Sequence, residues 1–235
     1  MYDIYIMRYL KMHHRVLHIA FLLIFFAAYS VTAGENMRFR EQTGSEVIYL
    51  QSTEDSLGEH LRLSSESETG ETHEVMVDAQ TLESLQWAHR NPADNTDYTA
   101  RISGRTIRVT GRNQGRQVDE SFRLEDADPW IQSIERSLEP FVRSSRERMQ
   151  FWTVQPGDLA LRKLQAVRRG RSTIDVDGER VDTWEVRISL PGIGSVFWSA
   201  TYWYRVSDGQ FVRYEGVRGW PGTPRTVVEL VTNAY

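Results

Sequence analysis

The sequence of 235 residues contains no cysteine. No disulfide can brace the fold, so a packed core must stabilise it. A cysteine nucleophile is excluded as well. An exported form of this chain is also expected to be soluble, because it lacks the cysteine that carries a lipid anchor directly after a signal peptide.

The chain has no excess of positive charge. Its net charge is −4, and its 40% hydrophobic and 26% charged residues are typical of a globular protein. Nucleic acids and anionic membranes attract basic proteins, so this balance argues against a nucleic-acid partner and against docking on anionic lipid headgroups.

Long hydrophobic runs are absent apart from one near the N-terminus, at 16–31. Basic residues precede this run, and Val31-Thr32-Ala33 ends it. The pattern predicts a signal peptide over 1–33, cleaved after Ala33, and a periplasmic or secreted protein that meets the membrane only during export. The alternative is an uncleaved anchor helix, although the run is shorter than the roughly 20 residues that span a bilayer.

After the leader, short β-like stretches alternate with turns rich in Gly, Asn and Asp, which predicts an antiparallel meander rather than βαβ units. The predicted strands cover 47–50, 57–67, 72–79, 85–90, 98–103, 106–110, 117–124, 159–167, 172–176, 180–190, 196–206, 211–216 and 225–232. We interpret 34–235 as a single β-rich domain with two β blocks, about 45–125 and 149–233.

A helix over about 129–147 is predicted to join the two blocks. Asp128 is a suitable N-cap, and Pro129 suits the first helical position. Apolar residues follow at helical spacing, and Pro140 is expected to kink or split the helix. The predicted fold class is α+β, mostly β: a large curved antiparallel sheet, a half-barrel-like meander, with one main helix packed against it.

The predicted strand at 196–206 is the most aromatic part of the chain. Alternation places Trp198, Tyr202 and Tyr204 on one face, and Trp203 and Arg205 on the other. One face is expected to meet the core, and the other lines a groove if the sheet is curved. The alternative is that both faces are covered. The candidate ligand-binding residues are Trp198, Tyr202, Trp203, Tyr204, Arg205 and Arg213.

A basic turn, Arg168-Arg169-Gly170-Arg171, is predicted between two strands. It is interpreted either as a receptor for an acidic partner or as a solvated hairpin tip that discourages aggregation at the sheet edge.

The remaining candidates for chemistry are weak. His60, His73 and His89 lack the HxH or HxxxH spacing of metal ligands, so neither a metal nor a cofactor is expected. No G-x-S-x-G elbow is present, and no catalytic residue is predicted. Asp208 and Glu215 form an imaginable carboxylate pair, but carboxylates are too common for this to carry weight.

The stretch 159–230 resembles the C-terminal half of a family of bacterial exported proteins of unknown function. The resemblance rests on an Asp177-Gly178 hairpin, a Thr183-Trp184-Glu185-Val186 strand, the aromatic Tyr202-Trp203-Tyr204 and an Asp208-Gly209 turn. In architecture such proteins resemble the LolA/LolB-type periplasmic lipoprotein carriers, whose curved half-barrel is closed by helices around an apolar cavity. This implies a lipid or lipoprotein-like ligand and brings no catalytic residues.

We therefore expect a non-enzymatic periplasmic protein that binds an apolar or amphipathic ligand, or a cell-envelope component, in the concave face of its sheet. One alternative is a structural or protein-interaction module of the envelope. A further alternative is a hydrolase acting on envelope glycan or ester, which requires Asp208 or Glu215 to lie in a buried cleft.

Overall fold

The computed structural model describes residues 36–192, 194, 198–217 and 224–231. The predicted signal peptide, and Phe197 in the aromatic stretch, lie outside the described residues. None of the helices in the described ranges is long and apolar enough to cross a membrane.

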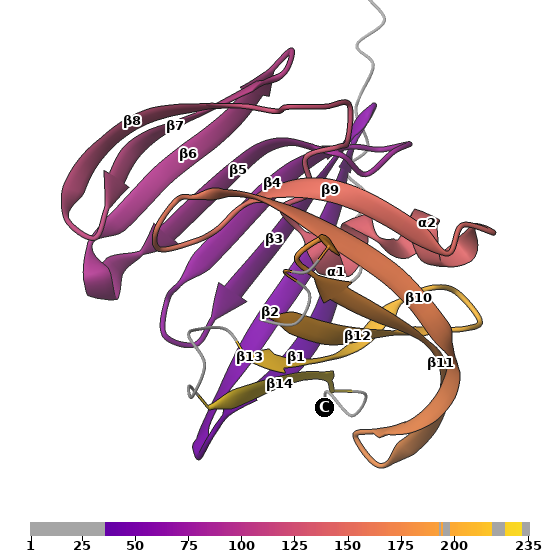
Figure 1. Cartoon of the computed structure of the whole chain (residues 1–235). Helices are drawn as coiled ribbons and strands as arrows, with labels where there is room; N and C mark the ends of the chain where they lie inside the picture. The colour runs from indigo at the N-terminus through magenta and orange to yellow at the C-terminus, as the bar shows by residue number, and fades with distance from the viewer. Residues whose placement is uncertain (1–35, 193, 195–197, 218–223, 232–235) are drawn as a thin grey trace, which may run out of the picture.

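Fourteen strands form one curved, antiparallel sheet that does not close, which confirms the predicted fold class (Figure 1). The strands are β1 (Asn36–Thr43), β2 (Glu46–Leu57), β3 (His60–Ser67), β4 (Thr72–Asp78), β5 (Ser84–Asn91), β6 (Thr96–Ser103), β7 (Thr106–Asn113), β8 (Arg116–Arg123), β9 (Arg148–Val154), β10 (Leu161–Val176), β11 (Glu179–Ser189), β12 (Ser199–Arg205), β13 (Phe211–Val217) and β14 (Arg225–Leu230). A short 3₁₀ helix, η1 (Pro92–Asp94), links β5 to β6.

The sheet consists of two meanders joined by one seam. Its order is β8-β7-β6-β5-β4-β3-β2-β1-β14-β13-β12-β11-β10-β9, so each strand pairs with its sequence neighbours within β1–β8 and within β9–β14. Among the described strands, only β1 and β14 pair across the two halves, from Phe39 opposite Leu230 to Thr43 opposite Thr226. The first and last strands therefore meet in the middle of the sheet.

The connection between β8 and β9 lies on the concave side and fills it. Backbone bonds tie this segment to two strands: Ile131 N–H donates to Trp152 O in β9, and Ser84 N–H in β5 donates to Trp130 O. Trp130 itself is 1% exposed. Two buried clusters result, one between the helices and β1 and β9–β14, the other between β3–β7 and β9. The connection thus covers the open edge of β9, which would otherwise attract another strand.

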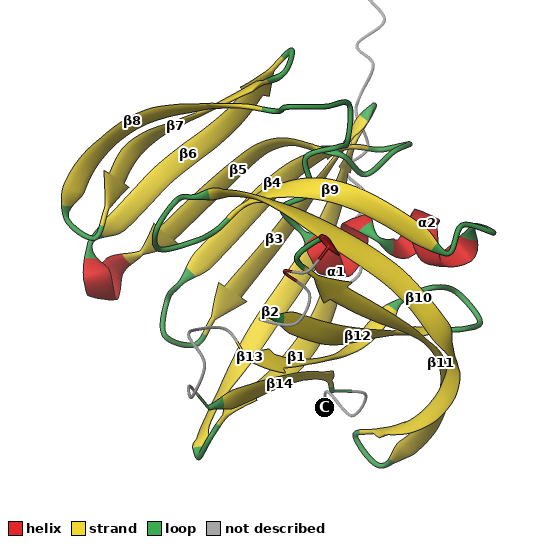
Figure 2. Ribbon diagram, in the orientation of Figure 1, coloured by secondary structure: helices red, strands yellow, loops and turns green. Residues whose placement is uncertain are grey.

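The helical part of this connection is shorter than the predicted 129–147. Helix α1 covers Ile134–Ser137 and α2 covers Glu139–Arg143, while the residues before them run extended beside β9 (Figure 2). Pro140 sits in the first turn of α2, where its missing N–H costs nothing. The pairing of Pro129 and Ile131 with Trp152 replaces the first helical turns with a strand-like segment.

The predicted basic turn at 168–171 is wrong. These residues lie inside β10, which runs without a break from Leu161 to Val176. The pairing with β11 shifts between Arg168 and Gly170, which is a β-bulge with Arg169 as the extra residue. Gly170 has a φ of +153°, which L side chains rarely adopt. The glycine marks a bulge rather than a hairpin tip.

Gly111 in β7 provides a test of the sheet packing. Its φ is +133°, and a Cβ atom would lie 2.4 Å from the carbonyl oxygen of Asp97 and 2.7 Å from the Cα of Tyr98. Because both obstacles are backbone atoms of β6, Gly111→Ala is expected to lower the free energy of unfolding by about 3 kcal/mol, measured by urea denaturation.

Gly104→Asn is the matched control for this substitution. Gly104 adopts a φ of +58° in the β6–β7 turn, where a Cβ atom would meet nothing within 4 Å, and asparagine tolerates that conformation. It should change the stability by no more than about 1 kcal/mol. Equal losses for the two variants would contradict the close packing of β6 on Gly111.

Candidate functional site

The aromatic strand β12 alternates as predicted. Ala200, Tyr202 and Tyr204 are buried in the core, and the residues between them are half-buried. The Tyr204 hydroxyl donates to the carbonyl of Ile134 at 3.1 Å, and burial raises its pKa well above the usual value. These tyrosines fill the concave side and do not line an open groove.

The other predicted ligand-binding residues lie around this core. Trp198 Nε1–H donates to the Val217 carbonyl at 2.9 Å. The Arg213 guanidinium lies 5.9 Å from the centre of the Trp203 ring and 2.6 Å from the Glu229 carboxylate. Arg205 contacts Asp208 and Gln210, which follow β12. A ligand-binding role for these residues stays a prediction.

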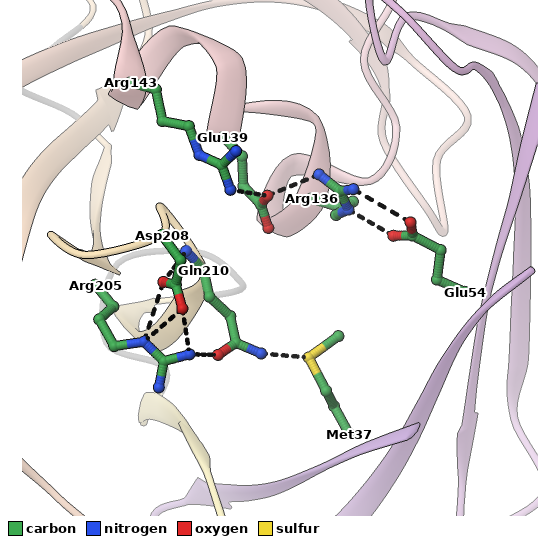
Figure 3. Close-up of polar contacts among 8 residues, drawn as sticks. All are labelled: Met37, Glu54, Arg136, Glu139, Arg143, Arg205, Asp208 and Gln210. Atoms are coloured by element: carbon green, nitrogen blue, oxygen red, sulfur yellow. Dashed lines mark hydrogen bonds and ion pairs between the residues drawn. The ribbon is translucent and has the colours of Figure 1, made fainter. Parts of the chain in front are cut away.

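A network of ion pairs lies beneath the two helices (Figure 3). Arg136 of α1 is 2.6 Å from Glu54 of β2 and 2.7 Å from Glu139 of α2, and Arg143 lies 3.6 Å from Glu139. Burial raises the pKa of Glu139 to about 7, although both arginines act in the opposite direction. Desolvation dominates because the Glu139 side chain is only 11% exposed.

A second polar group lies close to the first (Figure 3). Arg205 pairs with Asp208 at 2.7 Å and also donates to Gln210, whose amide donates to the sulfur of Met37. The hydrogen bonds from Arg205 help to lower the pKa of Asp208 against the opposing effect of burial. These contacts fix the turn between β12 and β13.

The carboxylates that a hydrolase would need are both neutralised by arginine. Asp208 lies on an exposed turn, paired with Arg205. Glu215 lies in β13 and forms an ion pair with Arg225. In the part of the chain that the structure describes, two surface hollows are found, and neither Asp208 nor Glu215 lines them.

A hollow of about 390 Å³ lies where α2 approaches β10 and β11. We call it the arginine–tryptophan hollow. Two guanidiniums contact the same indole: Arg168 is 4.6 Å and Arg171 4.5 Å from the centre of the Trp184 ring. Its lining residues are Val142, Arg143, Ser144, Arg168, Arg171, Trp184, Val206 and Gly209.

The hollow is locally cationic. Arg168 is fixed by donating to the carbonyls of Val142 and Ser144, at 3.0 and 2.7 Å, at the end of α2. Within the described ranges, neither Arg168 nor Arg171 pairs with a carboxylate. Of the three arginines that line the hollow, only Arg143 forms an ion pair, with Glu139. A smaller hollow of about 110 Å³ on Arg148, Arg169 and Arg187 adds to the positive charge near the bulge.

Two of the three histidines in the described ranges lie close to Glu71, which lies in the turn between β3 and β4. His73 Nε2 and His89 Nε2 lie 3.2 and 2.9 Å from the same oxygen, Glu71 Oε1. The two imidazole rings stack with 4.2 Å between their centres. Hydrogen bonds from His73 and His89 hold the pKa of Glu71 well below its usual range. We call Glu71, His73 and His89 the His–Glu cluster.

No model of a known protein family matches this sequence, and no curated protein sequence matches it. Among solved structures, a β-barrel-like protein of the domain of unknown function DUF1849 from Brucella abortus superposes with a TM-score of 0.53 at 8% identity, covering 85% of this chain and 96% of its own. This chain has that β-barrel-like fold.

Two further structures are more distant. The hypothetical lipoprotein YmcC from Escherichia coli gives a TM-score of 0.40 at 10% identity, covering 85% of each chain. A DUF1329 family protein from Desulfovibrio piger gives 0.26 at 9% identity, covering 84% of this chain and 82% of its own. The resemblance to the LolA/LolB carriers stays a prediction.

Sequence reasoning missed both the hollow and the His–Glu cluster as sites. Arg168 and Arg171 were assigned to a turn, so their position over Trp184 was not foreseen. The spacing of the histidines along the chain gave no signal, because His73 and His89 meet across the β4–β5 ladder. The one hint in the sequence was that both fall in predicted neighbouring strands.

Glu139→Gln tests the buried ion-pair network. The unfolded carboxyl ionises near pH 4.5 and the folded one near 7, so the wild-type protein should lose stability as the pH rises through this window. Glutamine does not titrate. Between pH 5 and 8, the free energy of unfolding of the variant should therefore rise relative to that of the wild type by up to about 2 kcal/mol, a figure reduced for solvent screening.

The measurement is chemical denaturation at a series of pH values. Exposed Glu147 is the control position, and Glu147→Gln should follow the wild-type profile. Parallel profiles for Glu139→Gln and the wild type would show that Glu139 ionises normally in the fold.

Proposed function

We propose that this chain is an exported, non-enzymatic binding protein that holds an amphipathic anion in the arginine–tryptophan hollow. The observation that carries the proposal is the pair of guanidiniums, Arg168 and Arg171, on one indole without a carboxylate partner in the described ranges. The signal peptide predicted over 1–33 supports export. Because Tyr202 and Tyr204 of β12 are buried in the core, the proposed ligand site is this hollow rather than the concave face of the sheet.

The chemistry of the hollow favours an anionic head with an apolar neighbour. Guanidiniums bind carboxylate and phosphate oxygens through planar pairs of N–H donors. Val142 and Val206 add aliphatic surface beside the Trp184 indole. The volume of about 390 Å³ lies at the small end of the range for small-molecule sites, so it suits a headgroup or a short amphiphile rather than a whole lipid.

The site is partly preorganised for such a ligand. The two carbonyls at the end of α2 hold Arg168 in place, so little side-chain freedom remains to be lost on binding. The overall charge of −4 repels anions at long range, but at contact distance the local arginines dominate because salt screens distant charges.

The test measures binding of a matched set of amphiphiles below their micelle concentration. Dodecyl phosphate and dodecanoate are the anions, and dodecyltrimethylammonium is the cationic control. Calorimetry should show binding of the anions and not of the cation. Arg171→Gln should weaken anion binding about tenfold, because it removes one charge-assisted hydrogen-bond donor.

Arg180→Gln is the control variant, since Arg180 is an exposed arginine of the neighbouring strand β11 that does not line the hollow. It should bind like the wild type. Equal binding of anion and cation, or equal affinity of Arg171→Gln and the wild type, would refute the proposal.

A further inference from the structure

The His–Glu cluster has the donor set of a transition-metal site. Its imidazole and carboxylate groups suit Zn²⁺ and its neighbours in the first transition row, and two nitrogen donors disfavour Mg²⁺ and Ca²⁺. Glu71 and His73 are each about one-third exposed, at 36% and 32%, whereas His89 is only 7% exposed. An ion therefore has access from solvent to a site with one firmly buried ligand.

The distances within the cluster fit a common ion. Ligand atoms that each lie about 2.1 Å from a zinc ion are at most about 4.2 Å apart. Glu71 Oε1 lies 3.2 Å from His73 Nε2 and 2.9 Å from His89 Nε2, and the ligand atoms all lie within 4.8 Å of one another. A shift of about 0.6 Å closes the widest possible gap to about 4.2 Å. Because the two rings are stacked nearly parallel, 8° apart, they must also tilt until both Nε2 lone pairs point to one ion.

The outer contacts of the two histidines differ. His89 Nδ1 lies 2.9 Å from the hydroxyl of Tyr98, which accepts a hydrogen bond as readily as it donates one. His89 can therefore carry its proton on Nδ1 and leave Nε2 for a metal, the arrangement found for most metal-ligating histidines.

His73 faces a competing contact. Trp87 Nε1–H donates to His73 Nδ1 at 3.2 Å, and an indole has no acceptor to offer. Without metal, the neutral His73 ring therefore carries its proton on Nε2 and donates it to Glu71. A metal at Nε2 moves this proton to Nδ1 and breaks the indole bond. One neutral hydrogen bond is worth about tenfold in an equilibrium constant, far less than the many orders of magnitude that zinc coordination supplies.

We propose that Glu71, His73 and His89 bind one Zn²⁺ ion, and that Trp87 weakens this binding by holding His73 in the competing tautomer. Three protein ligands leave a fourth position for water or for a ligand group. The site lies in the β1–β8 half of the sheet, on different strands from the arginine–tryptophan hollow. A negative result at one site therefore leaves the proposal for the other site unaffected.

The test is calorimetric titration of the full-length chain with ZnCl₂ at pH 7.5, free of any polyhistidine tag and after removal of metals with a chelator. The wild type should bind one tight equivalent. His73→Gln and Glu71→Gln, both at half-buried positions, should each weaken it at least about 100-fold, the upper range seen when even outer partners of a metal site are lost. Circular dichroism confirms that each variant is folded.

His60→Gln is the matched control, because His60 is an exposed histidine of β3 outside the cluster. It should bind zinc like the wild type, and His13, His14 and His18 of the leader are common to every variant. Absence of a tight equivalent in the wild type, or the same affinity in His73→Gln and Glu71→Gln as in the wild type, would overturn the site.

Trp87→Phe tests the tautomer argument on its own. Phenylalanine keeps an aromatic ring in the cluster but removes the indole N–H, so zinc affinity should rise about tenfold. An unchanged or lower affinity in the folded variant would show that the indole bond does not oppose the metal.

Discussion

In an antiparallel sheet, successive side chains point to opposite faces, and a shift of one residue in the pairing moves every later side chain to the other face. Both candidate sites depend on such a shift. In β10, the register of Arg168 with Val186 would place Arg171 opposite Thr183 if it continued unchanged. The bulge at Arg169 instead places Arg171 opposite Trp184. In β5, one extra residue, Leu85, places His89 rather than Ala88 opposite His73. Bulges commonly re-aim side chains in this way.

The interior of the curved sheet is packed with apolar side chains. The connection between β8 and β9 occupies the concave side with Trp130, Ile131, Leu138 and Phe141, all of them buried. Buried side chains there pack against both meanders, so the inner face of the sheet serves stability. Polar groups that enter this region must be paired, as Glu139 is with two arginines, and its raised pKa reports the cost of that burial.

The sequence predicts the larger features of this fold because they depend on local patterns. Turn residues at short intervals correctly indicate a meander, and the alternation of Tyr202 and Tyr204 correctly indicates a face directed to the core. The helix was predicted too long, because apolar spacing from Trp130 onward also suits an extended segment that two strands hold by backbone bonds. The sites were missed because they depend on cross-strand register, which single-residue bulges set and no local pattern reveals.

The seam between β1 and β14 has a consequence for how this chain folds. All other strand pairs join neighbours in sequence, so each meander can assemble through short loops that close at little entropic cost. The seam joins residues near opposite ends of the described chain, and such non-local pairing is slow. A ribosome-bound chain that has not yet released β14 cannot complete its sheet, and the edge of β1 stays open until then. The seam therefore forms only after β14 has been made and is free to pair with β1.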